Sequence, residues 1–154
     1  MREVNKFWAN ASKEQPVPLT DFTPEDTLIA LMISVSASDE TIRTSELISI
    51  ERMVNHLPVF SGYDMDRIRE VSNRLFGILA DEDGLDDLWA TVRRTLPERL
   101  FDTAYAMACD VAAADGAARE GELRFLEEMR YELNLDRLLA AAIEAGARAR
   151  HRKL

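Results

Sequence analysis

A short acidic motif that occurs twice, 76 residues apart, places the strongest constraint on how this chain folds. Residues 113–123 read AADGAAREGEL, in which a glutamate, Glu122, follows the aspartate of an Asp-Gly pair, Asp115, by seven residues. Residues 37–47 read ASDETIRTSEL and keep alanine, aspartate, arginine, glutamate and leucine at the same places. A motif repeated at a fixed spacing indicates that the chain contains two related halves.

The correspondence extends beyond the motif. Apolar and acidic residues keep the same offset in four further pairs, namely Ile50 and Leu126, Glu51 and Glu127, Met53 and Met129, and Leu57 and Leu133. After a loop that is six residues longer in the first half, residues 66–68 match residues 136–138. We therefore expect each half to contain the same succession of helices, with an acidic turn at the same point in each.

Hydrophobic periodicity predicts an all-α fold of about seven helices in two pseudo-symmetric, duplicated halves. Apolar residues recur at helical spacing, and no segment alternates as a strand would. The first expected helix starts at Thr23-Pro24, the second spans 44–56, the third begins near Asp64 and the fourth follows Gly84. The fifth starts with Pro97 at its first position, the sixth spans 120–133 and the seventh begins near Asp136. Core-facing positions expected in these helices include Leu28, Leu31, Leu85, Leu123 and Leu126. The predicted organisation is a partly ordered segment over residues 1–22, one helical domain over residues 23–147 and a basic tail over residues 148–154.

The charge balance excludes some classes of function. A net charge of −9 and a pI near 4.8 argue against nucleic-acid binding and against docking on anionic membranes. No run approaches the ~18 consecutive apolar residues of a membrane-spanning helix, and the N-terminus lacks the apolar core of a signal peptide. We therefore expect a cytoplasmic protein with no direct membrane insertion. The single cysteine, Cys109, lies in an apolar run and is expected to be an inert core residue.

The two acidic turns allow either a structural or a metal-binding interpretation. In the first, Asp115 stabilises a turn with Gly116 in the left-handed conformation, and Glu122 caps the next helix. In the second, the two halves pack so that Asp39, Glu46, Asp115 and Glu122 converge on a divalent cation. Oxygen ligands favour Ca²⁺, with Mg²⁺ or Mn²⁺ as alternatives, over Zn²⁺. The sequence implies no other cofactor.

Other acidic residues fit a metal site less well. Asp110 is one turn before the second motif, and we interpret it as a solvated or paired acid rather than an additional ligand. Residues 81–87 depart from the spacing of a calcium-binding loop and are expected to be solvated. The two histidines, His56 and His151, have no partner spacing typical of zinc sites.

The motif at residues 113–123 resembles the TerB family of tellurite-resistance proteins and the related N-terminal domain of some membrane-anchored J-domain co-chaperones. Residues 97–110 and 57–60 fit the same family, and the resemblance covers roughly residues 24–145. It implies an all-helical fold with pseudo-symmetric halves and an acidic cluster that binds metal. Asp115 and Glu122 match the family motif well, whereas Asp39 and Glu46 match it less closely because Glu40 replaces the glycine.

The resemblance also implies membership of a stress-response system linked to tellurite. We expect a non-enzymatic interaction module with a protein partner from that system, and we leave homo-oligomerisation open. The rival interpretation is a metal-dependent hydrolase that uses the same four carboxylates. Such an enzyme needs an open coordination position and an activated water, and nothing else in the chain supplies a general base.

Overall fold

Every regular element in the described part of the chain is helical. The computed structural model describes residues 18–38, 42–114, 116 and 118–154. Seven α-helices occur in these ranges: α2 (Pro24–Ala37), α3 (Thr44–His56), α4 (Arg67–Leu79), α5 (Gly84–Thr95), α6 (Phe101–Ala113), α7 (Glu120–Glu132) and α8 (Arg137–Arg150). Two short 3₁₀ turns, Pro58–Phe60 and Glu98–Leu100, precede α4 and α6. The predicted all-α class is confirmed, and most of the 1–22 segment lies outside the described residues.

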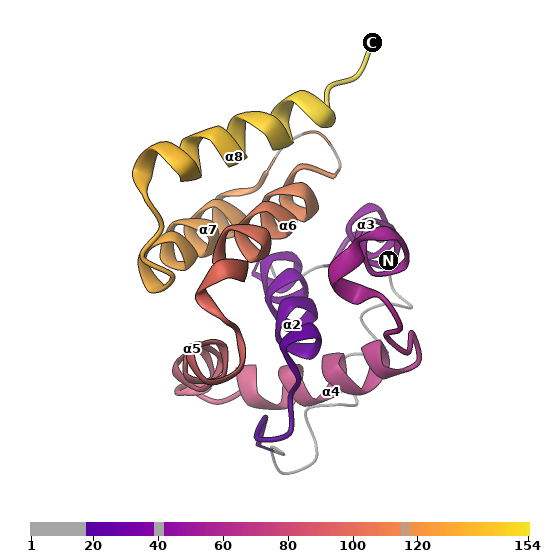
Figure 1. The fold of residues 1–154 in the computed structure, drawn as a ribbon, viewed down its shortest axis with the longest axis vertical. Coiled ribbons are helices and arrows are strands. Elements are labelled where there is room, and N and C mark those ends of the chain that lie inside the picture. Colours follow the sequence, from indigo (N-terminus) through magenta and orange to yellow (C-terminus); the bar gives the residue numbers. More distant parts are fainter. Residues whose placement is uncertain (1–17, 39–41, 115, 117) are drawn as a thin grey trace.

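Helix α2 lies at the centre of the molecule. It contacts α3, α4, α5, α6 and α7, which surround it (Figure 1). The sequence predicts one apolar face containing Leu28 and Leu31, but Ile29, Ala30 and Ile33 on the remaining surface are buried as well. A helix that is apolar on all sides can only be accommodated inside a core, which explains the central position of α2.

The order of the helices reflects the sequence duplication. Helices α2, α3 and α4 of the first half correspond to α6, α7 and α8 of the second, and α5 lies between the two sets along the chain. Helix α6 packs against α2, so the equivalent first helices of the two halves meet at the centre. Helix α8 then crosses over α6 at one side of the molecule (Figure 1).

Two predicted helix starts differ from the structure. Pro97 is followed by a 3₁₀ turn, and the α-helix begins only at Phe101. The helix expected to begin near Asp64 begins at Arg67, because residues 64–66 form a turn in which the Asp64 side chain accepts a hydrogen bond from the Asp66 backbone. By contrast, the 44–56 helix has the predicted bounds.

Two predicted core positions are also wrong. Leu85 and Leu123 are 39% and 53% exposed. Each lies in the first turn of its helix, and Leu123 lines an open cavity and is not covered by another helix. The contact between these helices is made elsewhere, where the Trp89 and Phe125 rings stack at 5.6 Å and the Trp89 indole donates to Glu128 at 3.2 Å. No helix among the described residues is long and apolar enough to cross a membrane.

Candidate functional site

The two glutamates of the repeated motif occupy the same position in two helices. Glu46 is the third residue of α3 and Glu122 is the third residue of α7, and each is only 1% exposed. The Glu46 carboxylate accepts a hydrogen bond from the backbone N–H of Arg43 at 3.1 Å, and Glu122 accepts one from Arg119 at 3.3 Å. Both therefore cap the first turn of a helix, where the helix dipole also favours negative charge.

The glycine of the second motif has the conformation expected of it. Gly116 has a φ of +100°, which side chains other than glycine rarely adopt, and a Cβ atom would meet no neighbour within 4 Å there. Glycine is thus required by the backbone conformation and not by lack of space. Two parts of the structural interpretation of this turn are confirmed, the left-handed Gly116 and the capping Glu122, whereas the predicted role of Asp115 lies outside the described residues.

The predicted metal-binding quartet is only half contained in the described residues. Asp39 and Asp115 lie outside them, as does Glu40, so the convergence of the four carboxylates stays a prediction. Within residues 18–38, 42–114, 116 and 118–154, no group of three or more histidine, cysteine, aspartate or glutamate side chains could hold a metal ion. Glu46 and Glu122 are the two predicted ligands whose positions the structure gives.

Asp110 is a paired acid, as expected. Its Oδ1 atom accepts hydrogen bonds from the Arg150 guanidinium at 2.7 Å and 3.2 Å, and it lies 3.3 Å from Nε2 of His151. These contacts join the end of α8 to α6. Asp110 is therefore engaged by cationic side chains and does not extend the candidate cation site.

A buried ionic cluster at the start of α2 was missed by the sequence analysis. Asp26, 1% exposed, accepts hydrogen bonds from the Tyr63 hydroxyl at 2.5 Å and the Arg67 guanidinium at 3.1 Å. Burial acts to raise the pKa of the Asp26 carboxyl, but hydrogen bonds from Arg67, Tyr63 and the Thr23 backbone outweigh burial and hold that pKa below its usual range. The spacing from Thr23 signals the cap, but no sequence pattern signals the other two partners.

A similar cluster joins three helices of the second half. The Tyr105 hydroxyl of α6 donates to Glu144 of α8 at 2.5 Å, and Arg130 of α7 donates to both of them, at 2.8 Å and 2.5 Å. Burial, followed by the hydrogen bond to Glu144, raises the pKa of the Tyr105 phenol, which stays protonated. Each half thus contains a tyrosine, a carboxylate and an arginine in contact, although the positions are not equivalent in the repeat.

The one cysteine is chemically inert. Cys109 is 4% exposed, and burial raises the pKa of its thiol to about 12. Because the thiolate is the reactive form, this residue is not an activated nucleophile at neutral pH. The core interpretation of Cys109 is confirmed.

Comparison with known proteins identifies a family. A family model described as tellurite resistance protein TerB matches residues 25–145. The matched range begins at the second residue of α2 and ends within α8, so it includes both acidic motifs and both halves of the repeat. No curated protein and no solved structure matches the chain.

Proposed function

Because this chain belongs to the TerB family of tellurite-resistance proteins, we propose that it is a cytoplasmic, non-enzymatic interaction module of a stress-response system, with a divalent-cation site at its two acidic turns. The ligands would be Asp39, Glu46, Asp115 and Glu122. Ca²⁺ is the favoured ion, since carboxylate oxygens suit hard cations. A protein of the same system would be its partner.

The observation that carries the cation proposal is the burial of two equivalent glutamates beside two equivalent acidic turns. Glu46 and Glu122 are each 1% exposed, and burying a carboxylate is costly unless its charge is compensated. Each carboxylate accepts a capping hydrogen bond and has about four acceptor sites, so it can cap a helix and coordinate an ion at the same time. A cation shared between the turns would further offset the cost of burying these two charges.

The second candidate is that the glutamates are structural caps and that the module acts only through a protein partner. The specific observation in its favour is that both glutamates already make the capping hydrogen bond. The two candidates differ in one measurable property. Only the first makes the stability of the protein depend on divalent ions.

The test is calorimetric titration of metal-stripped protein with Ca²⁺, Mg²⁺, Mn²⁺ and Zn²⁺, with a thermal melt of each sample. Ca²⁺ at about 100 times its dissociation constant should stabilise the fold by roughly 2.7 kcal/mol, a rise in Tm of roughly 5–10 °C. The variant Asp115→Asn with Glu122→Gln should lose the heat of binding and the rise in Tm. Glutamine can still accept the capping hydrogen bond, so the metal-free stability of this variant should change little.

The matched control is Asp81→Asn with Glu82→Gln. These two exposed residues precede α5, and the change removes the same charge from the chain. The control should bind Ca²⁺ as the unmodified protein does. Absence of heat and of any Tm shift with all four ions would reject the cation site and leave the capping interpretation.

A further inference from the structure

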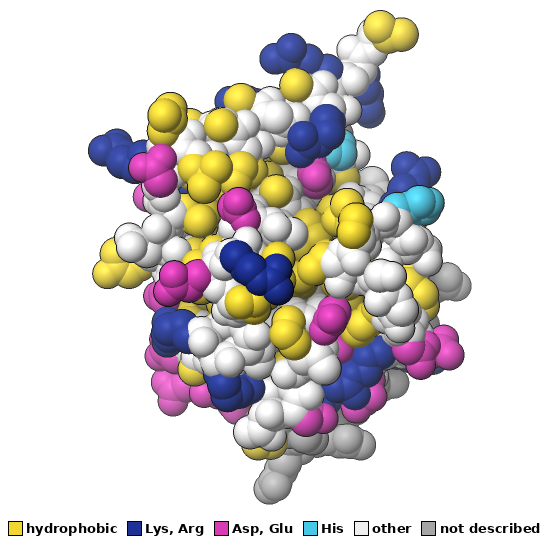
Figure 2. All heavy atoms as spheres, in the orientation of Figure 1, with side chains coloured by type: hydrophobic (Ala, Val, Ile, Leu, Met, Phe, Trp, Pro, Cys, Tyr) yellow, Lys and Arg dark blue, Asp and Glu magenta, His cyan; other side chains and the backbone are white. Residues whose placement is uncertain are grey.

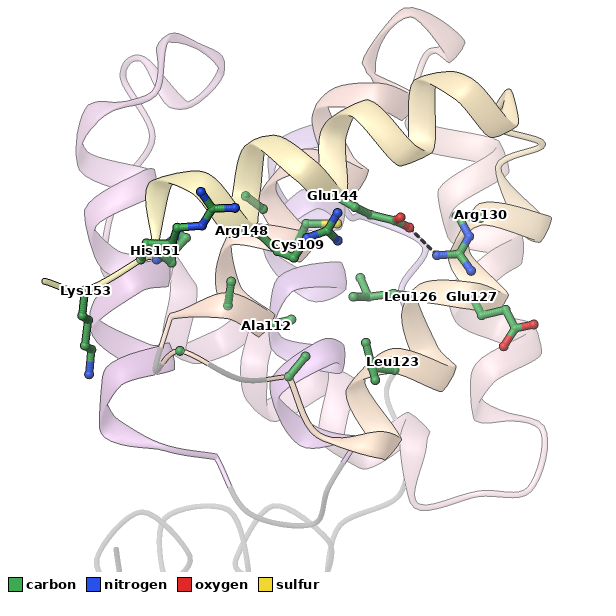
Figure 3. Close-up of a pocket in the computed structure, with 15 residues that line it drawn as sticks. Cys109, Ala112, Leu123, Leu126, Glu127, Arg130, Glu144, Arg148, His151 and Lys153 are labelled. Atoms are coloured by element: carbon green, nitrogen blue, oxygen red, sulfur yellow. Dashed lines mark hydrogen bonds and ion pairs between the residues drawn. The ribbon is translucent and has the colours of Figure 1, made fainter.

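A cavity of about 830 Å³ lies between α6, α7 and α8. Its apolar surface comes from side chains of all three helices, among them Cys109, Ala112, Leu126 and Ala147, each at most 5% exposed (Figure 3). Three of these side chains are small, which leaves room above them. The volume falls within the ~300–1,000 Å³ that is usual for small-molecule sites.

One end of the cavity is strongly cationic. Arg148, Arg152 and Lys153 line it there, and Figure 3 shows Arg148 and Lys153 at the side where α8 ends. Residues 145–154 contain four arginine or lysine residues and no acidic residue, in a protein whose net charge is −9. Positive charge is therefore concentrated at one mouth of this cavity, against the overall charge of the molecule.

These three cations are available to a ligand. Among the described residues, Arg148, Arg152 and Lys153 form no hydrogen bond or ion pair. Arg150, which does not line the cavity, is the cation of this segment that pairs with Asp110. His151 lines the cavity and lies 3.3 Å from Asp110, so the cationic mouth adjoins the contact that holds the end of α8 against α6.

The opposite end of the cavity is lined by two glutamates, Glu127 and Glu144, and one arginine, Arg130. Glu144 accepts hydrogen bonds from Arg130 (Figure 3) and from the Tyr105 hydroxyl, whereas Glu127 forms no ion pair among the described residues. Hydrophobic side chains gather along the edge of α8 on the face shown in Figure 2. From one end to the other, the cavity therefore offers unpaired positive charge, then apolar surface, then an acidic end at which Arg130 neutralises Glu144.

We propose that this cavity binds a single-chain anionic amphiphile, with its aliphatic chain on the apolar surface of α6, α7 and α8 and its carboxylate or phosphate head among Arg148, Arg152 and Lys153. Arginine and lysine both bind such head groups through charge-assisted hydrogen bonds. A free fatty acid shares this chemistry with the phosphate and one acyl chain of an anionic membrane lipid. The proposed contacts use none of the four carboxylates of the proposed cation site, although Gly116 and Ala118 of the second acidic motif line the cavity. Either proposal can therefore fail alone.

The first test is titration calorimetry with decanoate and decyl phosphate below their micelle concentrations, in parallel with decanol, decyltrimethylammonium and inorganic phosphate. The two anionic amphiphiles should bind saturably, and the other three ligands about tenfold more weakly or not at all. Affinity should rise about fourfold for each CH₂ group from hexanoate to decanoate. If decanol bound as tightly as decanoate, the cations would not contribute to binding. If inorganic phosphate bound as tightly, the apolar surface would not contribute. Either result overturns the proposal.

The second test separates the head-group contacts from net charge. The triple variant Arg148→Gln, Arg152→Gln and Lys153→Gln should bind decanoate about tenfold more weakly, with an unchanged melting temperature because all three side chains are exposed. The matched control is Arg52→Gln, Arg99→Gln and Arg137→Gln, which removes the same charge from exposed arginines that do not line the cavity. An equal loss of decanoate affinity in both variants would mean that only the net charge of the protein affects binding, and it would overturn the proposed site.

A third test locates the chain and identifies the source of the ligand. Ala113→Leu fills part of the cavity from a half-buried position and should abolish decanoate binding; unchanged binding in a folded variant would contradict the site. Flotation with phosphatidylcholine vesicles containing phosphatidylglycerol shows whether a membrane lipid can supply the ligand. Vesicle binding that decanoate displaces supports a lipid source, and decanoate binding without vesicle binding supports a free amphiphile. Vesicle binding that decanoate leaves unchanged, with no binding of the monomer, overturns the proposal.

Discussion

The absence of a Cβ atom at Gly84 allows the end of α4 and the start of α5 to pack closely. Gly84 begins α5 directly after the short turn from α4, and a Cβ atom at this position would lie 2.2 Å from the carbonyl oxygen of Ile78 and 2.8 Å from the Cα atom of Leu79. Both are backbone atoms of the α4 end, so they cannot move aside as a flexible side chain could. The sequence places this glycine at the end of an acidic loop and does not indicate the close contact. Residues 81–83 of that loop are exposed, as predicted.

We predict that Gly84→Ala lowers the free energy of unfolding by about 1–3 kcal/mol, because α4 and α5 must separate to admit the methyl group. Urea denaturation monitored by circular dichroism measures this change. Gly146→Ala is the matched control, since Gly146 lies inside α8 and its Cβ would meet only the Arg150 side chain, at 3.2 Å. That substitution should be neutral or stabilising by about 0.5–1 kcal/mol. Equal effects at the two glycines would show that the turn between α4 and α5 adapts.

At the scale of a single element, α2 is the helix on which the others depend. Eleven of its 14 residues are buried, among them Ser34, whose hydroxyl donates to the Ala30 carbonyl at 2.7 Å, so that a polar group is satisfied within the helix. Its N-terminus is fixed by a capping box between Thr23 and Asp26. The helix is therefore specified at its start by local hydrogen bonds and along its length by packing on all sides.

Ile29→Ala should destabilise the protein as strongly as Leu31→Ala, by about 2–5 kcal/mol, although only Leu31 lies on the face that periodicity predicts. Both side chains are fully buried, so each truncation leaves a cavity inside the core. The melting temperature should fall by about 5–15 °C in each case. Ile48→Ala, at a position 43% exposed on α3, is the control and should cost less than about 1 kcal/mol. A small effect at Ile29 would contradict burial of α2 on all sides.

The whole molecule is held together by a few buried polar contacts between distant segments as well as by its core. Asp26 connects the start of α2 to Tyr63 and to Arg67 of α4. Arg67 also lies 3.8 Å from Asp21, whose pKa is lowered by its hydrogen bond to Arg74. Two carboxylates on this side of the molecule thus lose their protons more readily in the folded state than in the unfolded chain.

Because folding lowers both pKa values, the protein should lose stability as the pH falls. A carboxyl whose pKa is lowered by folding contributes stability above the unfolded value of about 4, and that contribution is lost as the pH falls through the folded pKa. The free energy of unfolding should be level between about pH 5 and 7 and should fall below about pH 4. Asp26→Asn should lower the free energy of unfolding at neutral pH and reduce the further loss of stability below about pH 4. Urea unfolding at each pH measures both effects.

The exposed substitution Asp86→Asn is the control for this experiment, because it removes one carboxylate from the first turn of α5 without disturbing a buried contact. It should leave the loss of stability below about pH 4 unchanged. If Asp26→Asn retained the full acid dependence, the Tyr63 and Arg67 contacts would not be its source.

Local and repetitive features were predictable from the amino-acid sequence. The duplication is visible in the sequence itself. The all-α class, the bounds of the 44–56 helix and the capping role of Glu122 depend on interactions between residues close in the chain, which sequence spacing reflects directly. The resemblance of residues 113–123 to TerB is confirmed by the family match over residues 25–145.

The tertiary structure alone decided which surfaces are covered and which side chains meet across the fold. Spacing cannot show that Ile29 is buried while Leu123 is exposed, because burial depends on which helices lie nearby. Nor can it show that Tyr105, Arg130 and Glu144 meet, or that α6, α7 and α8 leave a cavity with a cationic mouth. Such contacts join residues that are distant in sequence, and only the packing of complete helices brings them together.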